Sequence, residues 1–220
     1  VTGYSVTPNA GYDHPLWSWQ HDKITTNTYR TVAGINLNYV INKNISASFR
    51  GGINRYTLER REIRDLGSRA EGGVGSLTSD NFVNEDLEQT IMLNFDYKLS
   101  DSFDFKAIIG NNLLQNTTYR NGNYGREMKV PNIYSFMNYL NVSSLIDESA
   151  RKRNVGAFAD VTFSFKEFLF LNATARNDWS SSLPKNNRSY FYPSVSLSFI
   201  LTEALKMESD ILSFAKLRGG

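Results

Sequence analysis

The sequence predicts an all-β fold, an antiparallel up-and-down meander of about eight long strands that forms part of a transmembrane β-barrel. Three observations predict this class. Apolar and polar residues alternate with a period of two along successive segments of the chain. The connections between these segments alternate between short and long, and aromatic residues gather beside the short ones. Short turns on one side of a membrane and long loops on the other are typical of outer-membrane barrels.

The first two strands are expected on either side of a short turn at residues 42–44. Residues 1–28 are rich in aromatic and polar residues without steady alternation, so they are predicted to form a loop. Alternation begins at Tyr29, and the second strand is expected to end near Glu59. The apolar positions are Ala33, Ile35, Leu37 and Tyr39 in the first strand and Ile45, Ala47, Phe49, Gly51 and Ile53 in the second.

The third and fourth strands are expected around a tight turn at residues 100–102. A long polar loop is predicted on either side of this pair, at residues 60–86 and at residues 116–152. The apolar positions are Leu87, Ile91, Leu93, Phe95 and Tyr97 in the third strand and Phe103, Phe105, Ala107 and Ile109 in the fourth.

Three further strands are expected in residues 153–165, 168–178 and 192–199. In the last of them every second residue from Ser194 to Ser198 is serine, and small polar residues on one face suit a wall between lipid and water. A short helical turn within residues 201–210 and a final strand at residues 212–218 complete the meander. The apolar positions are Val155, Ala157, Ala159, Val161, Phe163, Leu169, Leu171, Ala173, Ala175, Val195, Leu197 and Phe199.

The turn after Phe165 decides which face of the next strand meets lipid. A two-residue turn would direct Arg176 into lipid, where an arginine at the bilayer midplane costs about 2–4 kcal/mol. A three-residue turn at residues 166–168 instead pairs Phe165 with Leu169, and it directs Leu171 outward and Arg176 into the lumen. Two further pairs are predicted with the same spacing, Ile41 with Ile45 and Leu99 with Phe103.

Strand length also agrees with a bilayer. About 11 residues at roughly 3.3 Å each span about 36 Å, which a tilt near 45° reduces to roughly 25 Å. A soluble β-sandwich, whose strands also alternate, is the structural alternative. In a barrel wall the apolar side chains are covered by lipid rather than by protein, so low burial is expected in the isolated chain. The positions chosen for this test are Ile35, Leu93, Ile109, Val161, Leu171 and Leu197.

Composition excludes several other classes. The 220 residues contain 24 Lys plus Arg and 22 Asp plus Glu, and this balance gives no reason to propose a nucleic-acid partner. Zero Cys excludes disulfides and thiol chemistry. No run of about 18 apolar residues predicts a membrane helix, but alternating barrel strands average out in such windows. The chain opens without a signal peptide and does not complete a barrel, so it is interpreted as an internal fragment of a longer protein.

One ordered motif carries a resemblance to a known family. It consists of Arg176-Asn177-Asp178-Trp179-Ser180-Ser181, then Leu183-Pro184-Lys185, then Ser189-Tyr190-Phe191-Tyr192-Pro193-Ser194-Val195-Ser196. This motif closely resembles the SusC/RagA family of TonB-dependent nutrient transporters in the outer membrane of Bacteroidetes-type bacteria. Residues 212–218 resemble the strand that follows in the family, and residues 130–135 resemble a weaker upstream motif. The resemblance is good over residues 154–218 and concerns mainly the layout of the earlier part.

The resemblance implies a function for the whole protein. Residues 1–220 would be one partial domain of a large transmembrane β-barrel with 22 strands and an internal plug, in the bacterial cell outer membrane. The transporter would import an oligosaccharide or a peptide with energy transmitted by TonB, and a SusD-like surface lipoprotein would cap it. The plug and the TonB box are expected outside this sequence. A β-rich surface binding or adhesion module without transport is the alternative function.

Candidate site residues fall into two groups. Arg176 and Asp178 share a lumen-facing side, where an ion pair is expected, and Trp179 follows them in the motif. The second group is aromatic, lies in the loop predicted at residues 116–152, and could stack on sugar rings, contact a partner or pack within the loop. Its members are Tyr119, Tyr124, Tyr134, Phe136 and Tyr139.

No enzyme, cofactor or metal site is predicted. No Ser/His/Asp arrangement is recognisable, and His14 and His21 lack a third ligand at a defined spacing. Gly72-Gly73-Val74-Gly75 is only a weak likeness to a phosphate loop, because no strand-to-helix pattern surrounds it. A basic cluster at an outer strand end is either solvated or in contact with anionic lipopolysaccharide. It consists of Arg60, Arg61, Arg64 and Arg69.

Overall fold

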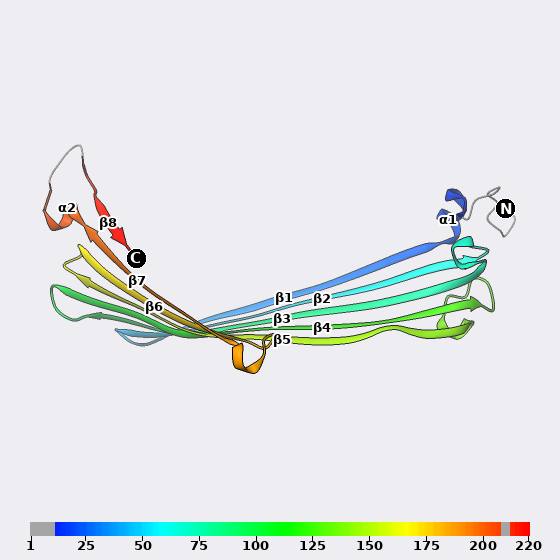
Figure 1. Cartoon of the computed structure of the whole chain (residues 1–220), viewed down its shortest axis with the longest axis horizontal. Coiled ribbons are helices and arrows are strands. Elements are labelled where there is room, and N and C mark those ends of the chain that lie inside the picture. The colour runs from blue at the N-terminus through cyan, green and yellow to red at the C-terminus, as the bar shows by residue number, and fades with distance from the viewer. Residues whose placement is uncertain (1–11, 208–211) are drawn as a thin grey trace. The chain divides into compact units, whose positions relative to one another are not determined.

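The computed structural model describes residues 12–207 and 212–220, and these form one eight-stranded sheet (Figure 1). Neighbouring strands in the sheet are also neighbours in the sequence, which confirms the predicted up-and-down meander. No helix in the described residues is both long and apolar enough to cross a membrane. The strands are β1 (Lys23–Asn42), β2 (Ile45–Leu66), β3 (Val74–Lys98), β4 (Phe103–Met128), β5 (Tyr139–Phe165), β6 (Leu169–Ser180), β7 (Ser189–Ile200) and β8 (Lys216–Gly219).

The first five strands are much longer than predicted, with 20 to 27 residues each. Most of the two long loops predicted at residues 60–86 and 116–152 is therefore strand, and this part of the prediction was wrong. The physical reason is that backbone pairing needs no apolar face. Where both faces are polar, the ladder continues without the alternation that reveals a strand in the sequence.

Two short helices flank the sheet. α1 (Pro15–His21) lies in the segment predicted as a loop, and its start is set by Pro15 and by the His14 ring, whose Nδ1 accepts a hydrogen bond from the Leu16 amide at 3.2 Å. α2 (Leu201–Ala204) forms the helical turn expected after β7. Residues 1–11 of the predicted loop and residues 208–211 lie outside the described residues.

The chain divides into two compact units. We call residues 32–53, 86–116 and 152–220 the strand-turn unit, because it holds the short turns. We call residues 1–31, 54–85 and 117–151 the extension unit, because it holds the strand parts that continue beyond the alternating segments. The extension unit has a small core, in which Leu77, Met128 and Tyr139 are buried and Ile63, Leu66, Tyr134 and Phe136 pack against them.

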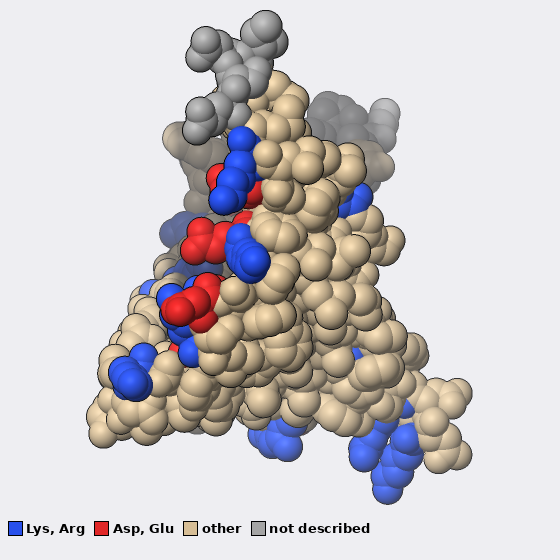
Figure 2. All heavy atoms as spheres, turned by 90° about the vertical axis from the view of Figure 1, so that its left-hand side faces the viewer, with Lys and Arg blue, Asp and Glu red and all other residues tan. Residues whose placement is uncertain are grey.

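The strand-turn unit has two chemically different faces. The odd-numbered face carries aromatic rings beside the short turns, among them Phe103, Phe165 and Phe199. The ring centroids of Phe103 and Phe165 are 4.7 Å apart, and Phe168 in the turn lies 5.4 Å from Phe165 and 5.8 Å from Phe199. The even-numbered face carries polar groups such as Asn172, whose amide donates to Asp160 at 2.9 Å. On the side of the molecule shown in Figure 2, acidic and basic side chains gather together along one edge, and a broad area shows neither.

The predicted register after Phe165 is confirmed. Phe165 pairs with Leu169, so Leu171 and Arg176 lie on opposite faces of β6. The turn has unusual backbone geometry, because Lys166 and Glu167 both adopt positive φ, at 46° and 59°. The Leu99 amide donates to the Phe103 carbonyl at 2.9 Å, in agreement with the second predicted pair. The pairing of Ile41 with Ile45 stays a prediction.

The apolar face is largely uncovered by protein. Five of the six test positions are exposed at 39 to 52% of their accessible area, namely Ile35, Leu93, Ile109, Leu171 and Leu197. Val161 is the exception, because it is half-buried. An apolar face this open would be unstable in water, and it is the arrangement that a lipid-facing wall requires.

Candidate functional site on the polar face of the sheet

The predicted Arg176–Asp178 ion pair is present and belongs to a larger network. The Arg176 guanidinium donates from Nε to Asp178 Oδ2 at 2.9 Å, and its Nη2 lies 2.7 Å from Asp178 Oδ1. Nη2 also donates to the Asn112 side-chain oxygen on β4 at 3.0 Å. The guanidinium carbon lies 5.9 Å from the centre of the Phe158 ring, which adds a cation–π contact. Three strands therefore fix one arginine on the polar face.

Gly156 on β5 makes the room for this network. It pairs with Asp178, and a Cβ at this position would lie 2.5 Å from Asp178 Oδ1 and 2.6 Å from Arg176 Nη2. It would also collide with the Asn112 side-chain oxygen. The ion pair thus lies directly across a bare stretch of backbone, which only glycine provides.

A hollow of about 360 Å³ opens beside the ion pair. Tyr192 pairs with Arg176 and Tyr190 pairs with Asp178 across β6 and β7, and both rings line the hollow together with Trp179. The remaining lining consists of Asn112, Leu114, Asn154, Gly156, Arg176, Asp178 and Ser180. Hydrogen-bonding groups and aromatic rings are gathered here, so the chemistry of the hollow suits binding of a polar ligand.

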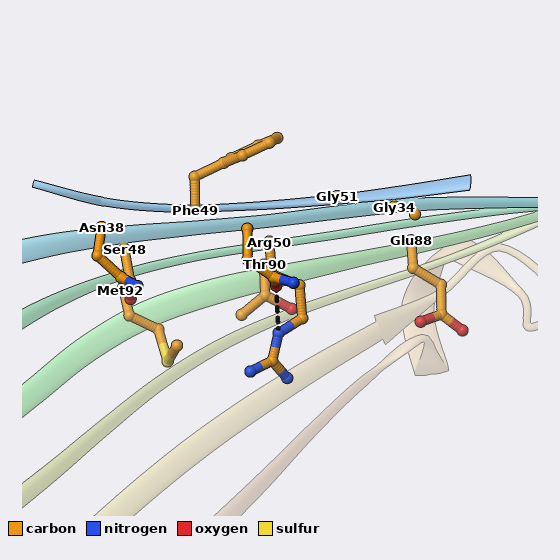
Figure 3. A pocket seen from close by; sticks show the side chains of 11 residues that line it. Gly34, Asn38, Ser48, Phe49, Arg50, Gly51, Glu88, Thr90 and Met92 are labelled. Carbon is orange, nitrogen blue, oxygen red and sulfur yellow. Dashed lines mark hydrogen bonds between the residues drawn. The ribbon is translucent and has the colours of Figure 1, made fainter.

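A second hollow of about 440 Å³ lies on β1, β2 and β3 (Figure 3). Gly34 and Gly52 leave it open, and the Arg50 guanidinium donates from Nε to Asn36 at 3.1 Å beside it. Figure 3 shows Arg50, Thr90 and Glu88 on one side of the sheet and Phe49 on the other. Sequence reasoning missed this hollow, although glycines at polar positions of two adjacent alternating strands are a signal that could have found it.

The aromatic candidates have different environments in the extension unit. Tyr119 and Tyr124 lie on β4 and Tyr139 begins β5, so these three are strand residues and their assignment to a loop was wrong. Tyr119 is exposed, and the Tyr124 hydroxyl donates to Glu71 at 2.7 Å. Tyr139 is only 3% exposed and lies in the core, with Tyr134 and Phe136 half-buried against it. A role of these five rings in substrate contact stays a prediction.

We expect Tyr139→Phe to leave the stability of the extension unit unchanged or to raise it by about 1 kcal/mol, because the buried hydroxyl has no hydrogen-bond partner among the described residues. The same burial raises the pKa of Tyr139 to about 12. Chemical unfolding of the full-length protein measures the change. A clear loss of stability in this variant would contradict the prediction.

The basic cluster is largely paired within the extension unit. Arg64 lies 2.9 Å from Asp22 and 2.7 Å from Glu62, and the hydrogen bond with Asp22 raises the pKa of Arg64. Arg60 also contacts Glu62 at 3.1 Å, and Arg61 donates to the Tyr134 carbonyl at 2.7 Å. These three side chains therefore bind groups within the protein, which supports a role for them in ordering the extension unit.

The Asp80–Arg120 pair gives the extension unit a dependence on acid. Arg120 Nη2 and Nε donate to the two carboxylate oxygens at 2.7 and 3.0 Å, and these hydrogen bonds hold the pKa of Asp80 below its ordinary value. Because the pKa of Asp80 is lower in the folded state, the pair stabilises the folded protein at pH values above the unfolded-state pKa of about 3.9. This contribution is lost as the pH falls through the folded-state pKa.

We therefore expect thermal stability to decrease between about pH 4 and the acid limit, and Asp80→Asn should lack this part of the decrease. Melting curves at stepped pH measure it. Asp101→Asn is the matched control, because Asp101 is fully exposed and contacts Lys98 only at 3.5 Å. If both variants lost the same amount of acid dependence, the acid dependence could not be assigned to the Asp80–Arg120 pair.

Comparison with known proteins identifies the family. The family model described as "TonB dependent receptor-like, beta-barrel" matches residues 1–216. The chain belongs to this family. Comparison with curated proteins gives no match.

Solved structures share the fold. The "Structure of the RagAB peptide transporter" matches with a TM-score of 0.83 and 15% identity, over 97% of this chain and 24% of that chain. The RagAB peptide importer in the "open-open" state matches with a TM-score of 0.81 and 15% identity. In the "closed-closed" state the values are 0.82 and 14%. Both matches again cover 97% of this chain and 24% of the other, so the TonB-dependent receptor chain spans about a quarter of the length of these structures.

Proposed function

We propose that this chain forms part of the wall of a SusC/RagA-type TonB-dependent importer in the bacterial outer membrane. The observation that carries this proposal is the two-faced strand-turn unit of a TonB-dependent receptor barrel. One face is apolar and uncovered, and the other holds the Arg176–Asp178–Asn112 network and two polar hollows. Such a wall separates lipid from a polar lumen.

The transported nutrient is an oligosaccharide or a peptide. Support comes from the polar hollows, whose amides, charged groups and tyrosine rings can bind either class, and from the fold shared with the RagAB peptide transporter. A SusD-like lipoprotein captures the nutrient outside the cell, and TonB supplies the energy through a plug.

Membrane location and uptake together test this function. The full-length transporter should sediment with the outer-membrane fraction and resist extraction without detergent. Cells that carry it should accumulate a labelled oligosaccharide or peptide, and deletion of TonB should abolish accumulation. An adhesion module would reach the surface yet give the same uptake with and without TonB, and this result would overturn the proposal.

A further inference from the structure

The apolar face of the strand-turn unit is interrupted by a groove of about 420 Å³ on β1, β2 and β3. Gly51 forms the floor of the groove, because it has no side chain whereas the neighbouring outward positions on β2 carry large ones. Ile35, Ile53 and Leu87 form its apolar lining. The groove and the hollow at Arg50 share lining residues at Gly34, Gly51 and Gly52, but Figure 3 shows Phe49 and Arg50 on opposite sides of the sheet.

The ring of Phe49 and the bare backbone of Gly51 shape the groove. A Cβ on Gly51 would lie 3.1 Å from two ring carbons of Phe49 and 3.5 Å from Cγ2 of Ile35. The ring therefore leans along its own strand over the glycine, and Figure 3 shows Phe49 on the side opposite to Arg50. A side chain at position 51 would have to displace the ring and would fill the groove.

Two polar residues, Glu88 and Gln89, line the groove, and Figure 3 shows the Glu88 side chain on the opposite side of the sheet from Phe49. The Asn44 carbonyl accepts the Asp96 amide at 2.8 Å, and this antiparallel register, continued along β2 and β3, places Gln89 opposite Gly51. The amide of Gln89 has no hydrogen-bond partner in the part of the chain that the structure describes. An amide that faces hydrocarbon without a partner is unfavourable, so a ligand that accepts its hydrogen bond would be bound preferentially.

The depth of Gln89 indicates what such a ligand offers. Gln89 lies about 11 residues before the short turn at Ser100, which is roughly 36 Å along the strand and about 25 Å along the membrane normal at a tilt near 45°. This equals the height of the apolar band of a barrel. Gln89 therefore lies at the interface on the side away from the short turns, where the ester groups of lipids meet their acyl chains.

We propose that the groove at Gly51 binds an ester-linked acyl chain of a bilayer lipid, and that the Gln89 amide donates a hydrogen bond to its ester carbonyl. This inference rests on the proposed function, which places this face in a bilayer. The groove is lined by ten residues, whereas a stable protein interface uses roughly 20–30 residues on each side. A single lipid chain is therefore a better occupant than a second copy or a partner protein.

Native mass spectrometry of the delipidated full-length transporter tests this site, with ester-linked and ether-linked phosphatidylethanolamine as the two probes. The ether lipid has the same chains and headgroup but no carbonyl. We expect the wild type to bind one ester lipid roughly fivefold more tightly than the ether lipid, which is the effect of one hydrogen bond. Gln89→Leu should remove this preference, and Gly51→Leu should remove the binding event.

Ala47→Leu is the matched control, because it adds the same side chain to the same face of β2 outside the groove. It should bind lipid as the wild type does. Equal binding by Gly51→Leu and Ala47→Leu would overturn the proposal, and so would equal affinity of the wild type for both lipids. The comparison of the two lipids uses only the wild-type protein, so it remains valid even if Gly51→Leu fails to fold. If Gly51→Leu bound as many lipid molecules as the wild type but lost the binding of another protein, the groove would be a protein-binding site. This result would also overturn the proposal.

None of these variants alters the polar face, so their failure leaves the proposed transport function intact. Conversely, a wild-type protein that stays in the aqueous phase would contradict the transport function, and that result is obtained before any lipid is added.

Discussion

Gly110→Ala is expected to lower the free energy of unfolding of the barrel by about 3 kcal/mol, although it adds only one methyl group. A Cβ on Gly110 would lie 2.6 Å from the Ile91 carbonyl oxygen, 2.7 Å from Cζ of Phe158 and 3.0 Å from Cγ of Met92. The side chains can turn away, but the carbonyl oxygen is fixed by the strand. The β3–β4 ladder must therefore open locally. Urea unfolding of the full-length protein in detergent micelles measures this loss.

Gly34→Ala is the matched control for this prediction. Gly34 also lies on the polar face of the strand-turn unit, but a Cβ there would meet its nearest backbone atom, the Gly51 carbonyl oxygen, at 3.5 Å, which is ordinary contact. Its unfolding free energy should remain within about 0.5 kcal/mol of the wild type. If both alanine variants lost the same amount of stability, the close approach of the strands at Gly110 could not be the cause.

The faces of the sheet could be predicted because two independent constraints agreed. Alternation alone shows that a strand has two faces, and the cost of burying Arg176 in lipid decided which face was which after the turn at residues 166–168. The structure has the expected pairing of Phe165 with Leu169. Side-chain parity is a local property, so a single turn length transmits it from one strand to the next.

The extension unit could not be predicted in the same way. Its core joins Leu77 on β3, Met128 at the end of β4 and Tyr139 at the start of β5. Leu77 is far from the other two in the sequence, and each of the three lies in a mainly polar segment without periodicity. A prediction would have required the register of strands that continue beyond the apolar band, and no sequence pattern fixes that register when neither face is buried in lipid.

For a related reason, the ion pair of the candidate site could be predicted from the sequence, but its partners on other strands could not. Arg176 and Asp178 are two residues apart on one strand, so a shared face and an ion pair follow from β geometry alone. Asn112 and Tyr192 reach the same arginine from β4 and β7. Their positions depend on the registers across β4–β5 and β6–β7, which long connections separate in the sequence. Gly156 carried the best missed signal, because a glycine inside a strand often marks the close approach of another group.

Val195→Arg should cost about 2–4 kcal/mol of folding free energy, because it places a charge near the middle of the lipid-facing band. Val195 is 61% exposed on the apolar face and pairs with Ala173, which in turn pairs with Val161.

Ser196→Arg is the adjacent control. Ser196 pairs with Asn172 on the polar face, where an added arginine meets water and polar groups. The fraction of folded, heat-modifiable barrel in outer-membrane extracts should therefore fall sharply for Val195→Arg and remain near wild type for Ser196→Arg. The reverse order would show that the apolar face lines the lumen, and the membrane assignment of the whole sheet would then fail.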